Sequence, residues 1–95
     1  MIEMLVFDLI EGADVDRFIA ADKRVQTDFA YQQPGLLRRT TGRSERGSWL
    51  VLDLWESADA ADACDEKWKT DPVAQEFMAF VDAATVRSAR FEELD

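Results

Sequence analysis

Histidine is absent from this chain of 95 residues, and cysteine occurs only once. Without histidine, the chain lacks the side chain that most often serves as a general base near neutral pH or as a haem ligand. The single cysteine, Cys64, cannot form an intramolecular disulfide, and no Cys or His spacing fits a zinc site. The four glycines stand apart, so no phosphate-binding loop is present. These absences predict a protein that needs no metal and no cofactor.

Basic residues are also scarce, because 11 Lys and Arg stand against 20 Asp and Glu, for a net charge of −9. A charge of this sign repels nucleic acids and anionic membranes. The strand-like start IEMLVFDLI has no basic region before it, and no apolar run is long enough to span a membrane. We therefore expect a cytoplasmic protein with neither partner, folded as a single domain over residues 1–95.

A repeat organises the chain. The segments LVFDLIEGAD (5–14) and LVLDLWESAD (50–59) agree at seven of ten positions with a constant offset of 45. Each copy begins with a short apolar run, which predicts strands over residues 2–10 and 48–55. A repeat of this kind predicts two similar structural units.

Helical periodicity follows each of these strands. The first helix is expected after an N-cap at Asp14 and before Pro34-Gly35, and the second after Ser57 or Asp59 with a break at Asp71-Pro72. Further strands are predicted over 36–41 and 85–94. The resulting order βαββαβ predicts an α+β, ferredoxin-like sandwich, with helices on one face of a four-stranded antiparallel sheet of order 4-1-3-2.

The two repeated strands lie at the centre of this sheet. Equivalent positions of the repeat assign one apolar set to the helix-covered face, namely Leu5, Phe7, Leu9, Leu50, Leu52 and Leu54. The opposite face then holds Met4, Val6, Asp8, Ile10, Trp49, Val51, Asp53 and Trp55. An uncovered apolar face of this size signals an interface. We therefore expect a homodimer whose sheets pack face to face through Trp49, Val51 and Trp55.

Three segments, QQPGLLRR, WESADAA and FMAFVDAATVRSARFEEL, carry a family resemblance together with the βαββαβ order. They resemble the antibiotic biosynthesis monooxygenase-like domains of the dimeric α/β-barrel superfamily, over nearly the whole chain. The resemblance implies two sheets packed into a barrel, with a cavity between helices and sheet in each subunit. Some relatives are cofactor-independent oxygenases of aromatic substrates, and others degrade haem. The haem-degrading branch uses a Trp, which Trp68 could match, but also an Asn and an axial His that are missing here.

Asp22 is unusual because it falls within the apolar stripe of the first predicted helix, between Phe18 and Val25. One interpretation is a structural ion pair with Arg38 or Arg39, since buried acids are nearly always paired. The other is a desolvated carboxylate of raised pKa that accepts a proton from a substrate.

Asp8 and Asp53 are related by the repeat and are expected on neighbouring strands of one face. Two carboxylates at that range repel each other unless cations compensate them. Arginines of the outer strands, Arg38 or Arg39 and Arg87 or Arg90, predict an Arg-Asp-Asp-Arg row. A metal site is the alternative.

Aromatic side chains form the third candidate group, comprising Trp55, Trp68, Phe77 and Phe80, with Tyr31 at the end of the first helix. They are either core residues or the walls of a flat apolar pocket, in which an indole N–H or the phenol directs a ligand. Cys64 shares the inward face and is expected to be a small buried hydrophobe.

Together these features predict a cofactor-independent monooxygenase acting on a small phenolic or quinol-like substrate. A substrate anion can itself reduce oxygen in a dry apolar cavity that holds a proton acceptor and an anion partner. The predicted catalytic residues are Asp22 and Trp68, and the predicted substrate-binding residues are Tyr31, Arg38, Trp55, Phe77 and Phe80, with Arg39 as the alternative anion partner. The alternative function is a non-catalytic dimer that binds a hydrophobic metabolite.

Overall fold

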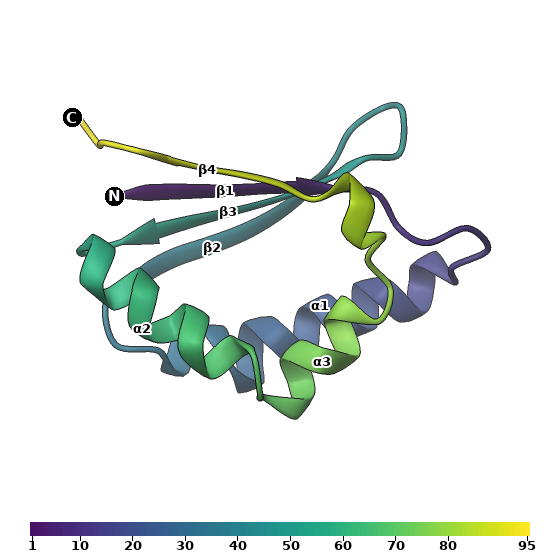
Figure 1. The fold of residues 1–95 in the computed structure, drawn as a ribbon, viewed down its shortest axis with the longest axis horizontal. Helices are drawn as coiled ribbons and strands as arrows, with labels where there is room; N and C mark the ends of the chain where they lie inside the picture. Colours follow the sequence, from purple (N-terminus) through teal and green to yellow (C-terminus); the bar gives the residue numbers. More distant parts are fainter.

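The computed structural model describes residues 1–95 as a sheet with one layer of helices beneath it (Figure 1). The strands are β1 (Ile2–Phe7), β2 (Leu36–Arg43), β3 (Trp49–Trp55) and β4 (Arg87–Phe91), in the antiparallel order β2-β3-β1-β4. The helices are α1 (Val15–Asp28), α2 (Ala58–Trp68) and α3 (Pro72–Met78), with 3-10 turns η1 (Ala30–Gln32) and η2 (Ala83–Thr85). The predicted ferredoxin-like architecture and sheet order are confirmed. None of these helices is both long and apolar enough to cross a membrane.

The helices begin where local capping chemistry places them. The side chain of Asp14 caps α1, Ser57 caps α2, and Asp71 caps α3 by accepting two backbone N–H groups. Pro72 occupies the first turn of α3, where its missing N–H costs nothing. The predicted break at Asp71-Pro72 therefore separates two helices that follow each other directly.

Gly35 fixes the approach of β2 to α2. Its φ is +85°, and a Cβ at this position would lie 2.6 Å from Cβ of Ala60. Its carbonyl also accepts the backbone N–H of Glu56 at 2.8 Å. Only glycine satisfies both the left-handed backbone and the close contact, which explains the Pro-Gly before the strand.

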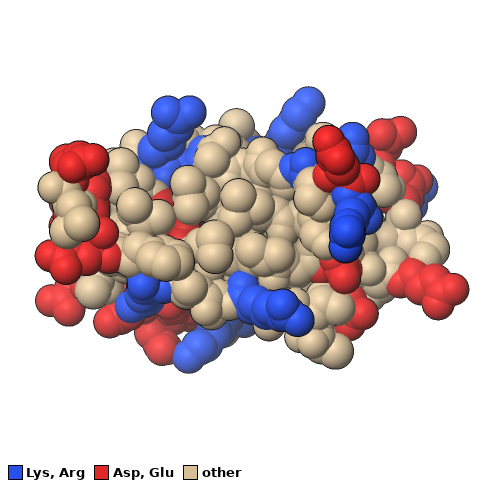
Figure 2. Space-filling view, turned by 90° about the horizontal axis from the view of Figure 1, so that it is seen from above, with Lys and Arg blue, Asp and Glu red and all other residues tan.

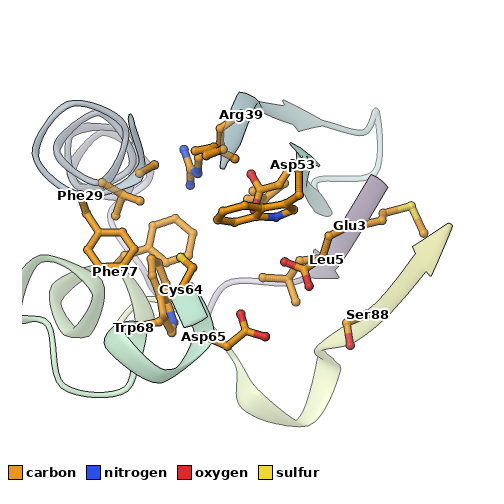
Figure 3. Close-up of a pocket in the computed structure, with 16 residues that line it drawn as sticks. Glu3, Leu5, Phe29, Arg39, Asp53, Cys64, Asp65, Trp68, Phe77 and Ser88 are labelled. Atoms are coloured by element: carbon orange, nitrogen blue, oxygen red, sulfur yellow. The ribbon is translucent and has the colours of Figure 1, made fainter. Parts of the chain in front are cut away.

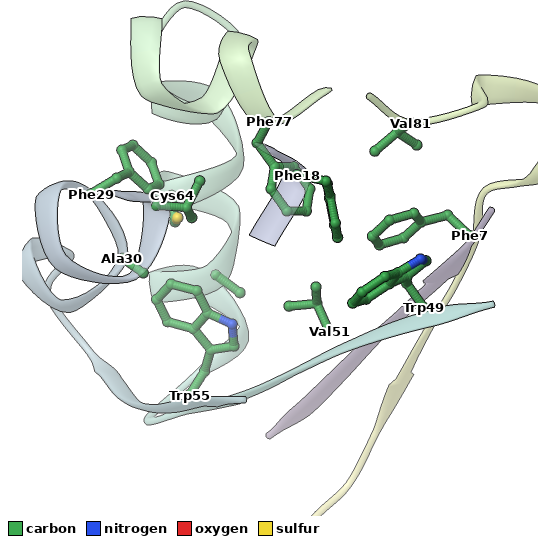
Figure 4. Close-up of a cluster of buried hydrophobic side chains, with 12 residues drawn as sticks. Phe7, Phe18, Phe29, Ala30, Trp49, Val51, Trp55, Cys64, Phe77 and Val81 are labelled. Carbon is green, nitrogen blue, oxygen red and sulfur yellow. The ribbon is translucent and has the colours of Figure 1, made fainter. Parts of the chain in front are cut away.

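The register of β1 and β3 decides which side chains face the helices. Leu5 pairs with Val51 and Phe7 with Trp49, and Phe7, Trp49 and Val51 are all buried in the core beneath the sheet (Figure 4). Trp55, on the same face, is only 2% exposed. The prediction that Trp49, Val51 and Trp55 form the uncovered face is therefore wrong, and so is the placement of the β3 leucines against the helices.

The error comes from the offset of the sequence repeat. Odd-numbered residues face the helices in both strands, so an odd offset of 45 matches an inward residue of β1 with an outward residue of β3. The helix caps stand at Asp14 and Ser57, a separation of 43. The two structural units are therefore real, but the connection before α1 is longer than the connection before α2, and the best sequence match is out of structural register.

The face of the sheet opposite the helices is still apolar at its centre. In-register pairs on β1 and β3 form its middle, namely Ile2 with Leu54, Met4 with Leu52 and Val6 with Leu50, all partly exposed. Figure 2 looks down on this face, and most charged side chains lie around its edges. No element of the chain covers these six residues.

Candidate functional site

A cavity of about 120 Å³ opens between the sheet and the helices. Eleven of its 16 lining residues are hydrophobic, and the five others are Glu3, Arg39, Asp53, Asp65 and Ser88 (Figure 3). Its size is close to the roughly 150 Å³ of an engineered apolar cavity that binds benzene. The cavity can therefore hold one aromatic ring.

Aromatic side chains form the wall on the helix side. Trp68 of α2 meets Phe29 edge-on, with ring centroids 5.4 Å apart, and meets Phe77 of α3 in the same way at 5.7 Å. Trp55 of β3 also lines the cavity, as does Cys64. The rings are held by contacts with one another, which keeps the wall in place without a ligand.

Arg39 is a buried cation at the edge of this cavity, with a side chain only 4% exposed. Its Nη2 donates to Oδ1 of Asp22 at 2.8 Å, and its Nη1 donates to Oε1 of Gln26 at 2.8 Å. The Thr41 hydroxyl donates to the same oxygen of Asp22 at 2.8 Å. The structure thus confirms the ion-pair interpretation of Asp22 and selects Arg39 as the partner.

A β-bulge explains why Arg39 and not Arg38 turns inward. The pairing of β2 with β3 shifts between Leu36, opposite Trp55, and Arg38, opposite Leu54. The extra residue, Leu37, is 53% exposed. Because a one-residue shift exchanges the two faces of a strand, Arg39 comes to lie opposite Asp53 on the helix side.

Asp53 is the exceptional residue of the cavity. Its Oδ1 is buried and has no hydrogen-bond partner. Burial raises the pKa of Asp53 from its ordinary value of 3.8 to about 6, against the opposing influence of the Arg39 charge, while Glu3 adds to the increase. Such a carboxyl can exchange a proton near neutral pH.

A second unpartnered polar group lies in the same cavity. Trp55 is 2% exposed, and its indole Nε1 has no hydrogen-bond partner. Buried indole N–H groups usually find an acceptor, so an orphan donor in a cavity wall is a place where a ligand oxygen could bind. Asp53 and Trp55 thus give the cavity lining one unpartnered acceptor and one unpartnered donor.

Carboxylates gather on the side of the cavity away from Phe29 and Phe77 (Figure 3). Glu3 of β1 and Asp65 of α2 line this side. The Arg90 guanidinium of β4 donates to Glu3 at 2.8 Å, to Asp62 at 2.7 Å and to Asp65 at 3.1 Å. We call this group, Glu3, Asp62, Asp65 and Arg90, the acidic mouth.

The predicted Arg-Asp-Asp-Arg row exists in altered form. Its order across the sheet is Arg39, Asp53, Glu3 and Arg90, and Glu3 takes the place assigned to Asp8. Asp8 lies beyond the end of β1, where it accepts a hydrogen bond from the Ser48 hydroxyl at 2.7 Å. Asp8 and Asp53 therefore do not form a pair, and the metal site that required this pair loses its basis.

The structure confirms the prediction that Cys64 is a small buried hydrophobe. It is 9% exposed, and burial together with the nearby Asp65 charge raises the pKa of its thiol to about 12. A thiol that stays protonated at neutral pH is a poor nucleophile. Cys64 therefore contributes shape and not reactivity to the cavity.

The predicted site residues divide into two groups. Trp55, Trp68 and Phe77 line the cavity. Four others do not line it, namely Asp22, Tyr31, Arg38 and Phe80. The Tyr31 hydroxyl is engaged with the backbone of Arg39, donating to its carbonyl at 3.2 Å and accepting its N–H at 3.0 Å.

Sequence reasoning missed Asp53 and Glu3 as cavity residues. The wrong face assignment of β3 hid Asp53, which shares the parity of the buried Val51 and Trp55. Glu3 was missed because Asp53, its partner across the strands, was placed on the opposite face. An antiparallel register in which Glu3 faces Asp53, and not a match by repeat offset, would have found the pair. The same register results when Trp49 and Trp55 are assigned to the buried face of β3.

Solved structures with the same fold are numerous, although no protein-family model and no curated protein sequence matches the chain. SnoaB, a cofactor-independent oxygenase from Streptomyces nogalater, superposes with a TM-score of 0.76 at 19% identity, covering 99% of this chain and 92% of that chain. An antibiotic biosynthesis monooxygenase gives a TM-score of 0.75 at 12% identity, with 100% of both chains covered. A dimeric ferredoxin-like protein of unknown function from Jannaschia sp. CCS1 gives 0.70 at 22% identity, covering 97% and 98%.

The chain has the fold of these ferredoxin-like proteins. The resemblance to antibiotic biosynthesis monooxygenase-like domains is thereby confirmed at the level of the fold. The three structures include oxygenases and a protein of unknown function, so the reaction must be inferred from the cavity itself.

Proposed function

We propose that this protein is a homodimeric, cofactor-independent monooxygenase that oxidises a small phenol in the cavity beneath the sheet. The observation that carries the proposal is Asp53, a buried carboxyl with an unpartnered oxygen and a pKa raised to about 6 by burial, in an aromatic-walled cavity. The oxygenases among proteins of the same fold support it.

The proposed reaction converts a phenol and dioxygen into a para-quinone and water. The phenolic O–H bond breaks and its proton passes to Asp53, which leaves an electron-rich phenolate. Dioxygen forms a bond to the para carbon, and the O–O bond breaks as the proton of that carbon leaves. The substrate loses four electrons; one oxygen atom remains in the quinone, and the other leaves as water with the two protons. The substrate supplies all the electrons, so no cofactor enters the balance.

The surrounding residues would stabilise the phenolate. The Trp55 Nε1–H can donate to the phenolate oxygen, and the Arg39 guanidinium provides a buried positive charge. Such groups are most effective in a cavity that excludes water. Trp68, Phe77 and Phe29 would bind the ring.

Asp22 has a different part in this proposal from the one the sequence predicted. One of its oxygens already accepts hydrogen bonds from Arg39 and Thr41, and Asp22 does not line the cavity. We assign it to positioning Arg39, and we assign the proton-accepting role to Asp53.

The homodimer is proposed from the uncovered face of the sheet. Its central residues, Met4, Leu50 and Leu52 among them, are apolar and unpaired within the chain. Two such faces packed together would remove them from water, as in aligned sheet packing. Proteins of the same fold described as dimeric support this assembly.

Oxygen uptake tests the proposed reaction. We expect uptake, with quinone formation, from at least one member of a panel of hydroxylated benzenes, hydroxylated naphthalenes and anthrones. Asp53→Asn should lower kcat by roughly 10²-fold or more, the usual contribution of a positioned acid or base. Glu45→Asn, in the exposed β2–β3 loop, is the control and should leave the rate unchanged. Absence of uptake from the whole panel would overturn the proposal.

The alternative is a dimer that binds a hydrophobic metabolite without oxidising it. The ion pair of Asp22 with Arg39 favours this reading, because it removes one carboxylate from chemistry. Tryptophan fluorescence separates the two functions. Quenching by a panel member without any oxygen uptake supports the binding protein, and quenching with uptake supports the oxygenase.

A further inference from the structure

The acidic mouth carries more negative charge than its own cation can neutralise. Glu3, Asp62 and Asp65 share the single guanidinium of Arg90. The other cation at the cavity, Arg39, is paired with Asp22 on the far side of Asp53. Asp53 adds a further carboxyl between them. The cavity therefore has an aromatic wall at one side and an excess of carboxylates at the other (Figure 3).

We propose that this site selects a phenol that carries a protonated amine, with the ring against the aromatic wall and the ammonium group at the acidic mouth. The proposal rests on the proposed function for the position of the phenol. The new element is the positive charge of the substrate. The orphan Nε1–H of the almost fully buried Trp55 marks the cavity as a place where a polar ligand atom is missing.

Charge complementarity determines the expected order of affinity. An ammonium group between Glu3 and Asp65 gains charge-assisted hydrogen bonds and relieves the repulsion between the carboxylates. A carboxylate at the same position would meet like charges in a partly desolvated setting. A neutral ligand is neither attracted nor repelled by the carboxylates, so its affinity should lie between those of the cationic and the anionic ligand.

Isothermal titration calorimetry with three matched phenols tests the proposal at near-neutral pH. Tyramine, 4-ethylphenol and 4-hydroxyphenylacetate share one ring and differ in the charge of a short para substituent. Because this substituent blocks the para carbon, none of the three can form a para-quinone, and the titration measures binding alone. We expect tyramine to bind roughly ten-fold or more tightly than 4-ethylphenol, the gain from a hydrogen bond to a charged group. We expect 4-hydroxyphenylacetate to bind more weakly than both, and the tyramine advantage to shrink with added salt.

Two variants with opposite expected effects separate charge selection from structural damage. Glu3→Gln removes a carboxylate from the cavity wall and should reduce the tyramine preference several-fold. Arg90→Gln removes the only cation of the acidic mouth and should increase that preference. Glu45→Gln makes the same charge change as Glu3→Gln far from the cavity and should leave all three affinities unchanged.

Equal affinities for the three phenols, tightest binding of 4-hydroxyphenylacetate, no binding of any of them, or a lower tyramine preference in both mouth variants would each overturn the inference. The oxygenase proposal is judged separately. If the three phenols bind in the expected order but no panel member gives oxygen uptake, charge selection is supported and the oxygenase proposal is contradicted. If oxygen uptake occurs but the expected order of affinity is absent, the oxygenase proposal is supported and charge selection is contradicted.

Discussion

Arg39 donates to Asp22 on α1, 2.8 Å away, and not to Asp53, the residue directly opposite it on the neighbouring strand. This choice leaves the Oδ1 atom of Asp53 without a hydrogen-bond partner inside the cavity. A single ion pair thus distinguishes two partly buried carboxylates, because Asp22 is paired and Asp53 keeps an unpartnered oxygen. Proteins that set two acids apart by environment commonly use them for different tasks.

Loss of Asp22 should destabilise the protein strongly. Asp22→Ala leaves Arg39 buried without its counterion, and breaking a buried pair in this way costs about 3 to 5 kcal/mol of unfolding free energy. Urea denaturation measures the change. Asp28→Ala, an exposed acid at the end of the same helix, is the control and should change stability by less than about 0.5 kcal/mol. Equal effects of the two variants would show that the Asp22–Arg39 pair contributes nothing.

Replacement of Asp53 should stabilise the protein in a pH-dependent manner. Below pH 3.8 the carboxyl is protonated in both the folded and the unfolded chain, so it does not lower the unfolding free energy. As the pH rises towards 6, the unfolded chain loses the proton first, so stability falls and then stays lower above pH 6. Asp53→Asn should therefore raise the unfolding free energy by on the order of 3 kcal/mol at pH 8 and change it little at pH 4. A loss of stability at pH 8 would contradict the assignment of Asp53 as an unpaired acid.

Alkylation of Cys64 should be slow in the folded protein. Its thiol pKa of about 12, raised by burial, keeps the thiolate fraction about a thousand-fold below that of an ordinary cysteine at neutral pH. Mass spectrometry after iodoacetamide treatment should find Cys64 unmodified in the native protein and fully modified in urea. Rapid modification of the native protein would show that the thiol is either exposed or activated.

Two neighbouring residues of β3 should respond differently to the same substitution. Leu52→Arg places a charge at the centre of the uncovered face and should convert a dimer into a folded monomer, as measured by sedimentation and circular dichroism. Val51→Arg buries a charge in the core and should prevent folding, since an unpaired buried cation costs several kcal/mol. A wild-type chain that sediments as a monomer would contradict the proposed dimer. Unfolding by Leu52→Arg and tolerance of Val51→Arg would reverse the face assignment.

Local signals were sufficient to predict most of the fold. The cap at Asp14, the cap at Ser57, which was one of two predicted positions, and the break at Asp71-Pro72 depend on residues adjacent in sequence, and all three lie where they were expected. The element order then restricts the topology to very few choices.

The candidate site could not be predicted in the same way, because β3 is apolar on both faces. In the sequence WLVLDLW, alternation alone does not say whether the leucines or the tryptophans meet the helices. The inward turn of Arg39 depends in addition on the bulge at Leu37, which local pattern does not reveal. An ion pair was one of two interpretations that the sequence allowed for Asp22, and the tertiary register decides between them, selects Arg39 as the partner and leaves Asp53 without one.

The proposed role of Asp53 as the proton acceptor is tested most directly by NMR titration of its side-chain carboxyl carbon in the folded protein. We expect a midpoint near 6, because the carboxyl is largely buried and Arg39 is paired with Asp22. Asp22→Asn should lower this midpoint if the released guanidinium turns to Asp53, since a nearby cation favours the charged carboxylate. A midpoint at or below the ordinary value of 3.8 in the native protein would show that Asp53 is already paired or solvated, and would contradict its proposed role as the proton acceptor.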